Sequence, residues 1–378
     1  MIANEVIVDL GAIRNNFFEI KRLAGPGSRV IAVIKSDAYG HGMIPVAQIL
    51  ESSGVDSFGV FELEEALDLR KAHCNIPILL MKGITADEVS AAVEKRLTVA
   101  LFQQDIAEKL SGTALKQGTV TPVHVKIDTG MGRLGVPWED ASDFLQGLLS
   151  LNGLLLEGIF SHCAVADVPD HPFTDEQIGR FLQVVKKSKQ LGVCSQAVHL
   201  ANSGALLAKK GIDLGMVRPG ILLYGSPPAE GLAGADSFKP AMTFKSRVTQ
   251  VKKVPAGASI SYGCTYRTRS TSTIATVPVG YDDGYSRMLS NKGEVLIHGK
   301  RVPIVGRVCM NLTMVDVSSL DGVSVGDEVV LLGAQGKERI TAEELARKIG
   351  TISYEVYCMI GKNNRRVHVD SQKRQQII

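Results

Sequence analysis

Short β-branched segments alternate with helical patterns over roughly the first 240 residues. Eight segments are typical of strands, and amphipathic segments with a helical period lie between most of them. The strand segments are nearly all apolar, as expected where both faces of a parallel sheet are buried. This alternation indicates βαβ units and constrains the fold more than any other feature. The eight segments are RVIAVIK, SFGVF, IPILLMK, LTVALF, VHVKID, LEGIFSH, AVHLAN and LGMVRPG.

A closed (β/α)₈ barrel, which typically takes about 250 residues, is the fold that eight such segments favour. The alternative is an open, doubly wound sheet, which often carries a GxGxxG turn after its first strand. Here KSDAYGHG, residues 35–42, follows the first candidate strand of the barrel, and the dinucleotide-binding pattern is missing. We therefore expect a TIM-type barrel over residues 1–238.

The pattern changes at a connector rich in Pro, Gly and Ala, residues 225–241. After it strands dominate, and one helical stretch interrupts them, opening with the capping-box pair Thr341 and Glu344. We expect a mostly antiparallel β domain over residues 239–378. It stays open whether the first strand, about residues 1–10, packs with this second domain.

Composition excludes several classes of function. The net charge of the 378-residue chain is +3, from 42 basic and 39 acidic residues, which is too small an excess to indicate a nucleic-acid partner. No window approaches the ~18 apolar residues of a membrane helix, and the N-terminus lacks the pattern of a signal peptide. The six cysteines are scattered without a CxxC pair, which is typical of reduced thiols in a cytosol rather than a disulfide frame or zinc site. We expect a cytoplasmic protein with no metal and no membrane partner.

Polar side chains stand at the ends of five candidate strands. In a barrel the active site lies at the carboxyl ends of the strands, so these groups should converge. Each residue alone is better explained as a solvated charge or a core histidine. Together they place several cations in one mouth, which is costly unless an anionic ligand is present. The residues are Lys35, Tyr39, Lys126, Asp128, Arg133, His162, His199, Asn202, Ser203 and Arg218.

This set of groups indicates a particular chemistry. A buried lysine loses its proton more easily and can attack a carbonyl. Backbone N–H groups at the small-residue turns NSG and PGI suit a phosphate, and an arginine can hold a carboxylate through two hydrogen bonds. A lysine nucleophile, a phosphate site and a carboxylate clamp together predict pyridoxal 5'-phosphate (PLP) and an amino acid as ligands.

Seven segments, in order and spacing, resemble bacterial alanine racemase over nearly the whole chain. The resemblance implies a PLP-binding barrel, a C-terminal β domain, and a homodimer whose subunits share their active sites. The substrate would be a free amino acid, with D-alanine supplied for peptidoglycan. The segments are AVIKSDAYGHG, KIDTGMGRLG, HLANSG, MVRPGILLYG, SYGCTYR, PVGYDDGY and GRVCMNLTMVDV.

The resemblance also implies two catalytic bases on opposite faces of the substrate. Lys35 matches the lysine that bonds PLP covalently, and Tyr262 matches a second base supplied by the other subunit. Free tyrosine has a pKa of ~10, so cationic surroundings must lower it. Arg218 matches the arginine at the pyridine nitrogen, and His199 its hydrogen-bonding support. Because arginine keeps its proton, it should weaken the cofactor as an electron sink and limit side reactions.

The remaining family positions concern binding. Arg133 matches the arginine for the substrate carboxylate, with Met310 from the other subunit, and Tyr281 a tyrosine near the entrance. Lys126 matches a lysine that is often carbamylated and orients Arg133. His162 and His199 match cofactor neighbours, and the matches to the phosphate neighbours are Tyr39, Ser203, Gly220, Ile221 and Tyr354.

One position departs from the family: Asn311 stands where many members carry Asp, which leaves substrate preference open. The nearest alternative is therefore a serine-preferring or broad-specificity racemase. A PLP-dependent decarboxylase would favour an acidic partner for the pyridine nitrogen, against Arg218. A non-catalytic PLP-binding protein can be a barrel alone, without a domain bearing Tyr262 and Met310. The remaining alternative is an unrelated barrel enzyme for a phosphorylated sugar.

His41 gains no chemical role and is interpreted as structural.

Overall fold

The computed structural model describes residues 4–193 and 197–371. The chain divides into two compact units. The barrel unit consists of Ile13–Ala38 and Met43–Lys239. The β unit consists of Met1–Ala12, Tyr39–Gly42 and Pro240–Ile378.

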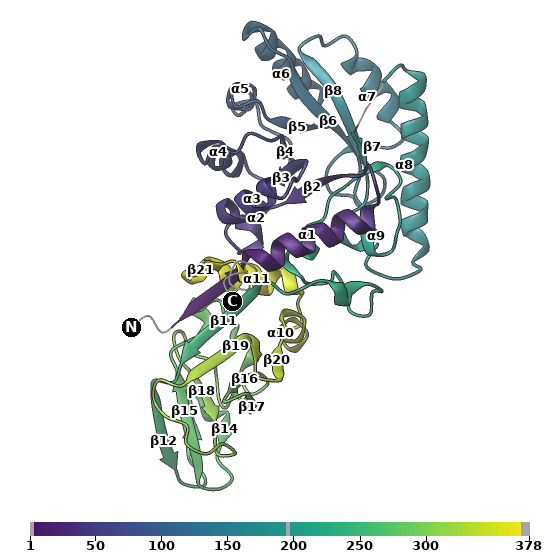
Figure 1. The fold of residues 1–378 in the computed structure, drawn as a ribbon. Coiled ribbons are helices and arrows are strands. Elements are labelled where there is room, and N and C mark those ends of the chain that lie inside the picture. The colour runs from purple at the N-terminus through teal and green to yellow at the C-terminus, as the bar shows by residue number, and fades with distance from the viewer. Residues whose placement is uncertain (1–3, 194–196, 372–378) are drawn as a thin grey trace. The chain divides into compact units, whose positions relative to one another are not determined.

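Eight parallel strands close on themselves in the barrel unit. Figure 1 shows how the chain alternates between these strands and the helices around them. Hydrogen bonds join neighbours around the ring, and the last strand, β10, pairs with the first, β2. The eight segments expected to be strands are confirmed, and so is the TIM-type barrel. The ring runs β2 (Arg29–Val33), β3 (Ser57–Val60), β4 (Ile78–Leu80), β5 (Thr98–Leu101), β6 (Thr121–Asp128), β8 (Leu154–Phe160), β9 (Ala197–His199) and β10 (Gly215–Val217), while β7 (Val136–Pro137) pairs with β6.

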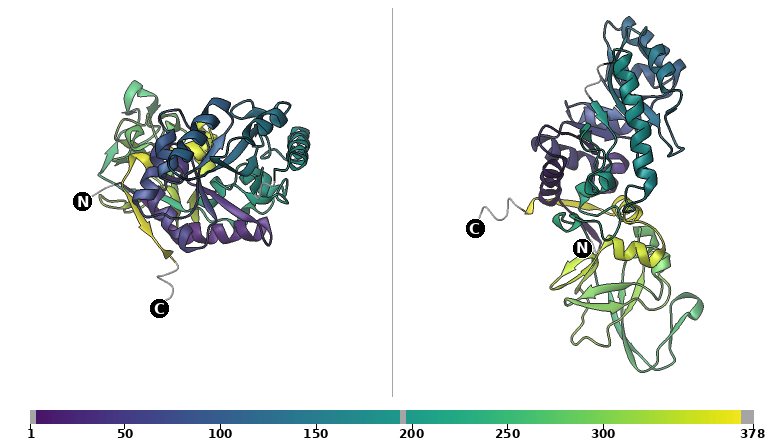
Figure 2. Two further views of the ribbon diagram at one scale, coloured as in Figure 1. Left: turned by 90° about the horizontal axis from the view of Figure 1, so that it is seen from above. Right: turned by 90° about the vertical axis from the view of Figure 1, so that its right-hand side faces the viewer.

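Helices connect successive strands and most of them bury one face, whereas the short helix at Ser203–Leu207 is buried on all sides. In α6 the buried side chains include Ile106, Leu110 and Ala114, which recur at four-residue spacing on one face of the helix. The long helix α8 begins at Pro172 with its N-cap at His171, and it lies along the outside of the barrel (Figure 2). The helices are α1 (Leu10–Ala24), α3 (Met43–Ser52), α4 (Leu63–Lys71), α5 (Val89–Glu94), α6 (Gln104–Lys116), α7 (Ala141–Leu148), α8 (Pro172–Gln190) and α9 (Ser203–Leu207).

A layer of apolar side chains fills the barrel interior. Six strands contribute one residue each, and every member is at most 4% exposed. Such burial stabilises the unit by about 1.5–3 kcal/mol for each large side chain. The layer fills the middle of the barrel. Side chains that come after it along the strands therefore lie nearer the carboxyl ends of the strands. Its members are Ile31, Leu79, Ala100, Phe160, Ala197 and Met216.

The β unit is built from mostly antiparallel strands, as expected. The first strand of the chain, β1 (Glu5–Asp9), pairs antiparallel with β11 (Met242–Arg247) and parallel with β21 (Arg366–Val369). The largest sheet continues through β19 (Glu328–Gln335), which also pairs with β20 (Glu338–Ile340), to β16 (Glu294–Ile297) and β17 (Lys300–Pro303). Smaller sheets join β12 (Gln250–Val254), β15 (Ser272–Val277) and β18 (Thr313–Asp316), and β13 (Ser259–Ile260) with β14 (Tyr266–Arg267).

Two helices complete the β unit. The N-cap of α10 (Ala342–Ile349) is Thr341, whose hydroxyl accepts a hydrogen bond from the Glu344 N–H at 3.1 Å, as the capping-box pattern predicts. Residues 39–42 lie against α11 (Ser353–Asn363), where a Cβ on Gly361 would come within 2.0 Å of the Gly40 carbonyl oxygen. Within residues 4–193 and 197–371, no helix is both long and apolar enough to span a membrane.

Candidate active site

The strand period carries three predicted residues to the mouth of the barrel. Side chains two positions apart along a strand lie on the same face. Each of the three follows a member of the interior layer by two positions: His199 ends β9, and His162 and Arg218 come within two residues after the ends of β8 and β10. The pairs are Phe160 and His162, Ala197 and His199, and Met216 and Arg218.

Arg218 is the most tightly held of these residues. It is 4% exposed, and its Nη1 donates to Nδ1 of His199 at 2.7 Å. Its Nη2 donates to the carbonyl oxygens of Ser161 at 2.5 Å and Leu200 at 3.2 Å. Burial lowers the pKa of Arg218 to about 10, which leaves the guanidinium charged at neutral pH. Several acceptors therefore fix the orientation of a buried cation.

Phe160 lies beneath this group, a contact that sequence reasoning missed. Its ring stacks on the imidazole of His199, and the Lys126 Nζ lies 4.5 Å from the ring centroid. The guanidinium carbon of Arg218 lies 5.1 Å from the same centroid. A cation near an aromatic face is attracted by the ring quadrupole. The signal in the sequence was the position of Phe160 two residues before His162.

Lys126 is 7% exposed at the end of β6. Burial, with the nearby charges of Arg218 and Arg133, lowers the pKa of its amine to about 7. Asp128 raises this pKa but directs an oxygen to the N–H groups of Gly130 at 2.8 Å and Gly132 at 3.2 Å. The Asp128 carboxylate thus holds the glycine turn that precedes Arg133. The Lys126 amine, with its lowered pKa, is partly neutral near pH 7.

His162 lies beside Arg218 and is half-buried. Its Nδ1 is 3.4 Å from the Arg218 Nη2, and its Nε2 is 3.5 Å from the Asn202 Nδ2. Burial and the charge of Arg218 hold the pKa of His162 well below its usual range. A neutral imidazole at this position offers a flat ring without adding charge.

The turns after β9 and β10 meet through one hydrogen bond. The N–H of Gly220 donates to the Ser203 Oγ at 3.0 Å, and Ile221 begins the buried 3-10 helix η1 (Ile221–Tyr224). Asn202 caps α9 by accepting from the Ala205 N–H at 2.9 Å. Two turns rich in small residues thus lie side by side at the same end of the barrel.

Lys35 follows β2 at the same end of the barrel. Its Nζ lies 5.1 Å from the centroid of the Phe61 ring. Its charge contributes to the lowered pKa values of Lys126 and His162, so the three residues share one electrostatic environment. Contacts around Phe160 and Arg218 bring Lys126, Arg218, His162 and His199 together, and the charges of Lys35 and Arg133 act on the Lys126 amine.

The backbone after Lys35 is left-handed. Ser36, Asp37 and Ala38 have φ values of 55°, 55° and 54°, which cost an L-residue roughly 1–2 kcal/mol each. Two hydrogen bonds hold the turn: the Ser36 N–H donates to Glu65 Oε1 at 2.5 Å, and Asp37 Oδ1 accepts from the Met43 N–H at 2.6 Å. Such strain concentrates at functional sites.

Other predicted residues belong to the β unit. The rings of Tyr39 and Tyr354 lie 5.8 Å apart between centroids. Burial raises the pKa of Tyr39, so its hydroxyl keeps its proton and can donate a hydrogen bond. His41 is fully buried, with Nδ1 3.1 Å from the Tyr39 carbonyl oxygen and its ring 5.1 Å from that of Tyr357.

Tyr262, Tyr281 and Met310 form a second cluster in the β unit, with exposed fractions of 72%, 42% and 55%. The segment 307–310 joins them. Its Arg307 carbonyl accepts from the hydroxyl of Ser261 at 2.7 Å, and its Cys309 carbonyl accepts from the Tyr281 N–H at 3.1 Å. We call Tyr262, Tyr281 and Met310 the exposed cluster. Next to it, the amide of Asn311 donates to Asp282 Oδ2 at 3.3 Å.

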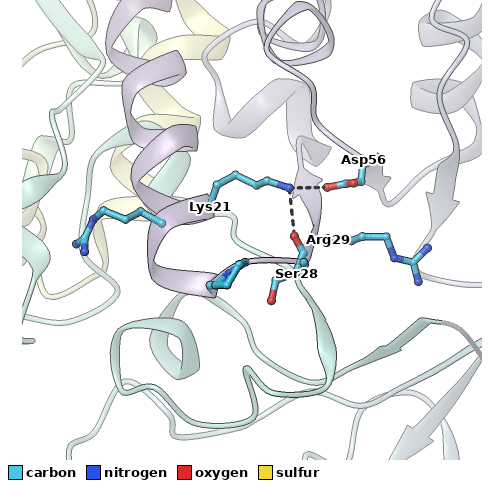
Figure 3. A pocket seen from close by; sticks show the side chains of 8 residues that line it. Lys21, Ser28, Arg29 and Asp56 are labelled. Atoms are coloured by element: carbon cyan, nitrogen blue, oxygen red, sulfur yellow. Dashed lines mark hydrogen bonds and ion pairs between the residues drawn. The ribbon is translucent and has the colours of Figure 1, made fainter.

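A cavity of about 610 Å³ lies elsewhere, at the amino ends of β2 and β3 (Figure 3). There Lys21 donates to the Ser28 carbonyl at 3.1 Å and pairs with Asp56 at 3.3 Å, and Arg29 lines the wall. None of the residues predicted for the active site lines this cavity.

Comparison with known proteins agrees with this architecture. Residues 8–228 match the family model of the alanine racemase N-terminal domain, and residues 241–368 match that of the C-terminal domain. The alanine racemase of Syntrophobacter fumaroxidans is 47% identical over 95% of each chain.

Solved structures are similar over nearly their full length. Alanine racemase from a D-cycloserine-producing Streptomyces lavendulae superposes with a TM-score of 0.93 at 32% identity, covering 99% of each chain. Alanine racemase from Bartonella henselae, with covalently bound pyridoxal phosphate, gives 0.89 at 28% identity, covering 98% of this chain and 100% of its own. With both domain models matched and a relative at 47% identity, the chain belongs to the alanine racemase family.

Proposed function

We propose that this protein interconverts L-alanine and D-alanine with PLP held at the carboxyl ends of the barrel strands. The observation that carries the proposal is the group of cations at one mouth, with Arg218 fixed among carbonyl oxygens and His199. Family membership and the PLP-bound relative from Bartonella henselae support it.

The residues present fit PLP by their chemistry. Lys35, Lys126, Arg133 and Arg218 lower the pKa values of their neighbours, which indicates a site that favours an anion. We propose that the joined turns at Ser203, Gly220 and Ile221 hold the phosphate. The hydroxyls of Tyr39 and Tyr354 would contribute hydrogen bonds to the same group, and Lys35 would provide the covalent attachment.

When bound to an amino acid, PLP withdraws electrons from the α-carbon and makes its proton easier to remove. Arg218 can only donate a hydrogen bond, so it would face the pyridine nitrogen without protonating it. His162, held neutral, would lie beside the ring. This assignment argues against a decarboxylase, because that chemistry benefits from a protonated pyridine nitrogen.

Two bases would move the α-proton. We propose that Nζ of Lys35 accepts or returns a proton on one face, and that the Tyr262 hydroxyl does so on the other. Arg133 would hold the substrate carboxylate through paired hydrogen bonds. Lys126 would orient Arg133, and its partly neutral amine can take up CO₂ as a carbamate, since the neutral form is the nucleophile.

The exposed cluster supports a homodimer with shared active sites. A catalytic tyrosine must lie against its substrate among groups that lower its pKa, yet Tyr262 is 72% exposed in a single chain. We propose that a second copy covers it, so that Tyr262, Tyr281 and Met310 complete the partner's site. The D-alanine produced would be used in peptidoglycan.

The test is a racemisation assay on L-alanine, L-serine and L-lysine with added PLP. We expect L-alanine to react fastest. Borohydride reduction followed by peptide mass spectrometry should place the cofactor mass on Lys35. A protein that takes up no PLP and racemises none of the three would refute the proposal. Faster turnover of L-serine would favour the serine-preferring alternative, which the Asn311–Asp282 contact makes worth testing.

A further inference from the structure

A row of hydrogen-bonding groups continues from Arg218 into the barrel interior. The Arg218 Nη1 lies 2.7 Å from Nδ1 of His199, and Nε2 of His199 lies 2.8 Å from Nδ1 of His124. Nε2 of His124 then lies 3.5 Å from Oε2 of Glu157. His199 is fully buried and His124 is 4% exposed. The row crosses from β10 through β9 and β6 to β8.

Arg218 can bond to His199 in only one way, and this requires every bond in the row to run in the same direction. Because a guanidinium has no acceptor, Nδ1 of His199 must accept and carry no proton. The proton of neutral His199 is therefore on Nε2 and points to Nδ1 of His124. Neutral His124 then carries its proton on Nε2, toward Glu157. Burial holds the pKa of both imidazoles below the usual range, consistent with neutral rings.

The backbone is shaped to bring Glu157 to the end of this row. In the register of β6 and β8, Val123 pairs with Leu156 and His124 pairs with Gly158, so Glu157 is an extra residue in a β-bulge. Bulges redirect side chains. The neighbouring glycine is also required, because a Cβ on Gly158 would lie 2.7 Å from Cγ and Cδ2 of the His124 ring.

We propose that His124 and Glu157 are positioning residues that fix His199 as the acceptor for Arg218. The inference rests on the function proposed above, in which Arg218 faces the pyridine nitrogen. Glu157 accepts a hydrogen bond from the proton-bearing Nε2 of His124, which leaves Nδ1 of His124 unprotonated. That nitrogen then accepts from Nε2 of His199, which leaves Nδ1 of His199 free to accept from Arg218. With Nη1 held by His199 and Nη2 held by backbone carbonyl oxygens, the remaining N–H groups of Arg218 keep one orientation.

The first test reads the two tautomers directly. Nitrogen NMR of the protein as purified, labelled with ¹⁵N-histidine, distinguishes a protonated ring nitrogen from an unprotonated one. Loss of signals in His124→Gln and His199→Gln variants assigns the rings. We expect protons on Nε2 and none on Nδ1 in both. A proton on Nδ1 of His199 would overturn the proposal, and this measurement requires no alanine and no turnover.

The second test separates positioning from simple stabilisation. Glu157→Leu removes the acceptor, whereas Glu157→Gln keeps a carbonyl oxygen. We expect Glu157→Leu to lower kcat about tenfold with KM nearly unchanged. Loss of the hydrogen-bonding partner behind a metal-ligating histidine has an effect of this size. Glu157→Leu should also give mixed tautomers of His124. Glu157→Gln should keep the wild-type ring signals and most of kcat.

Asp56→Asn is the matched control, since Asp56 is a half-buried carboxylate paired with Lys21 at the amino end of a strand. It should lower stability without changing the ring signals or kcat. If Glu157→Leu behaves like this control, the proposal is wrong. If Glu157→Leu fails to fold, the kcat of His124→Gln decides, because a wild-type value would overturn the proposal. If neither the wild type nor any variant racemises alanine, the proposed function is wrong. The ¹⁵N signals of the rings then still test whether His124 and Glu157 set the tautomer of His199.

Discussion

The rings of Phe160 and His199 lie nearly parallel, 4.8 Å apart between centroids with an interplanar angle of 9°. The same Phe160 ring lies within 4.5 Å of the Lys126 Nζ and 5.1 Å of the Arg218 guanidinium carbon. One aromatic side chain of the interior layer therefore supports three groups of the candidate site. Packing of the barrel and placement of the site depend on the same residue.

Replacement of this ring should affect stability and catalysis together. We expect Phe160→Leu to lower the free energy of unfolding by about 1–2 kcal/mol, because a buried ring is exchanged for a smaller side chain. It should also lower kcat for alanine by more than tenfold. Urea unfolding and racemisation kinetics give the two numbers. Phe58→Leu, at a fully buried ring of β3, is the control. Equal losses of kcat in both variants would contradict the special role of Phe160.

The lowered pKa of Lys126 predicts a dependence of stability on pH. The amine has a pKa of about 7 in the folded chain and ~10.5 when unfolded, so the unfolded state binds more protons between these values. Stability from this group therefore rises as pH increases from 7 to 10. Lys126→Met removes the effect, and its stability relative to the wild type should be greatest at pH 7 and below.

Urea unfolding at pH 6, 8 and 10 in bicarbonate-free buffer measures this difference. Lys253→Met, at an exposed lysine, serves as the control and should show no such trend. If the difference between Lys126→Met and the wild type is the same at all three pH values, the cationic environment of Lys126 does not have the assigned effect.

Mixing two inactive variants tests the shared active site. In a homodimer where Lys35 of one chain works with Tyr262 of the other, Lys35→Ala and Tyr262→Phe combine into a dimer with one intact site. Random exchange makes half of the dimers mixed, so about a quarter of wild-type activity should return. Co-expression with two different tags allows purification of the mixed dimer. No recovery would mean that both residues act within one chain.

The sequence was sufficient to predict the barrel because eight apolar strands and the helices between them repeat one pattern. The residues at the mouth followed from their positions at strand ends. The left-handed turn at Ser36–Ala38 was not predictable, because none of these residues is a glycine and tertiary contacts to Glu65 and Met43 hold it. His124 and Glu157 were missed because a bulge, which changes the strand period, brings them together.

Two helical glycines should respond in opposite directions to alanine. Within a helix alanine is favoured over glycine by roughly 0.5–1 kcal/mol, and Gly179 in α8 has open space around its Cβ position. We therefore expect Gly179→Ala to raise the unfolding free energy. At Gly361 in α11 a Cβ would lie 2.0 Å from the Gly40 carbonyl oxygen, so Gly361→Ala must separate residues 39–42 from the helix. We expect a loss of about 2–4 kcal/mol, comparable to a severe overpacking. Thermal and urea unfolding of the two variants measure the signs, and a Gly361→Ala protein as stable as the wild type would show that this close contact of the backbones is not required.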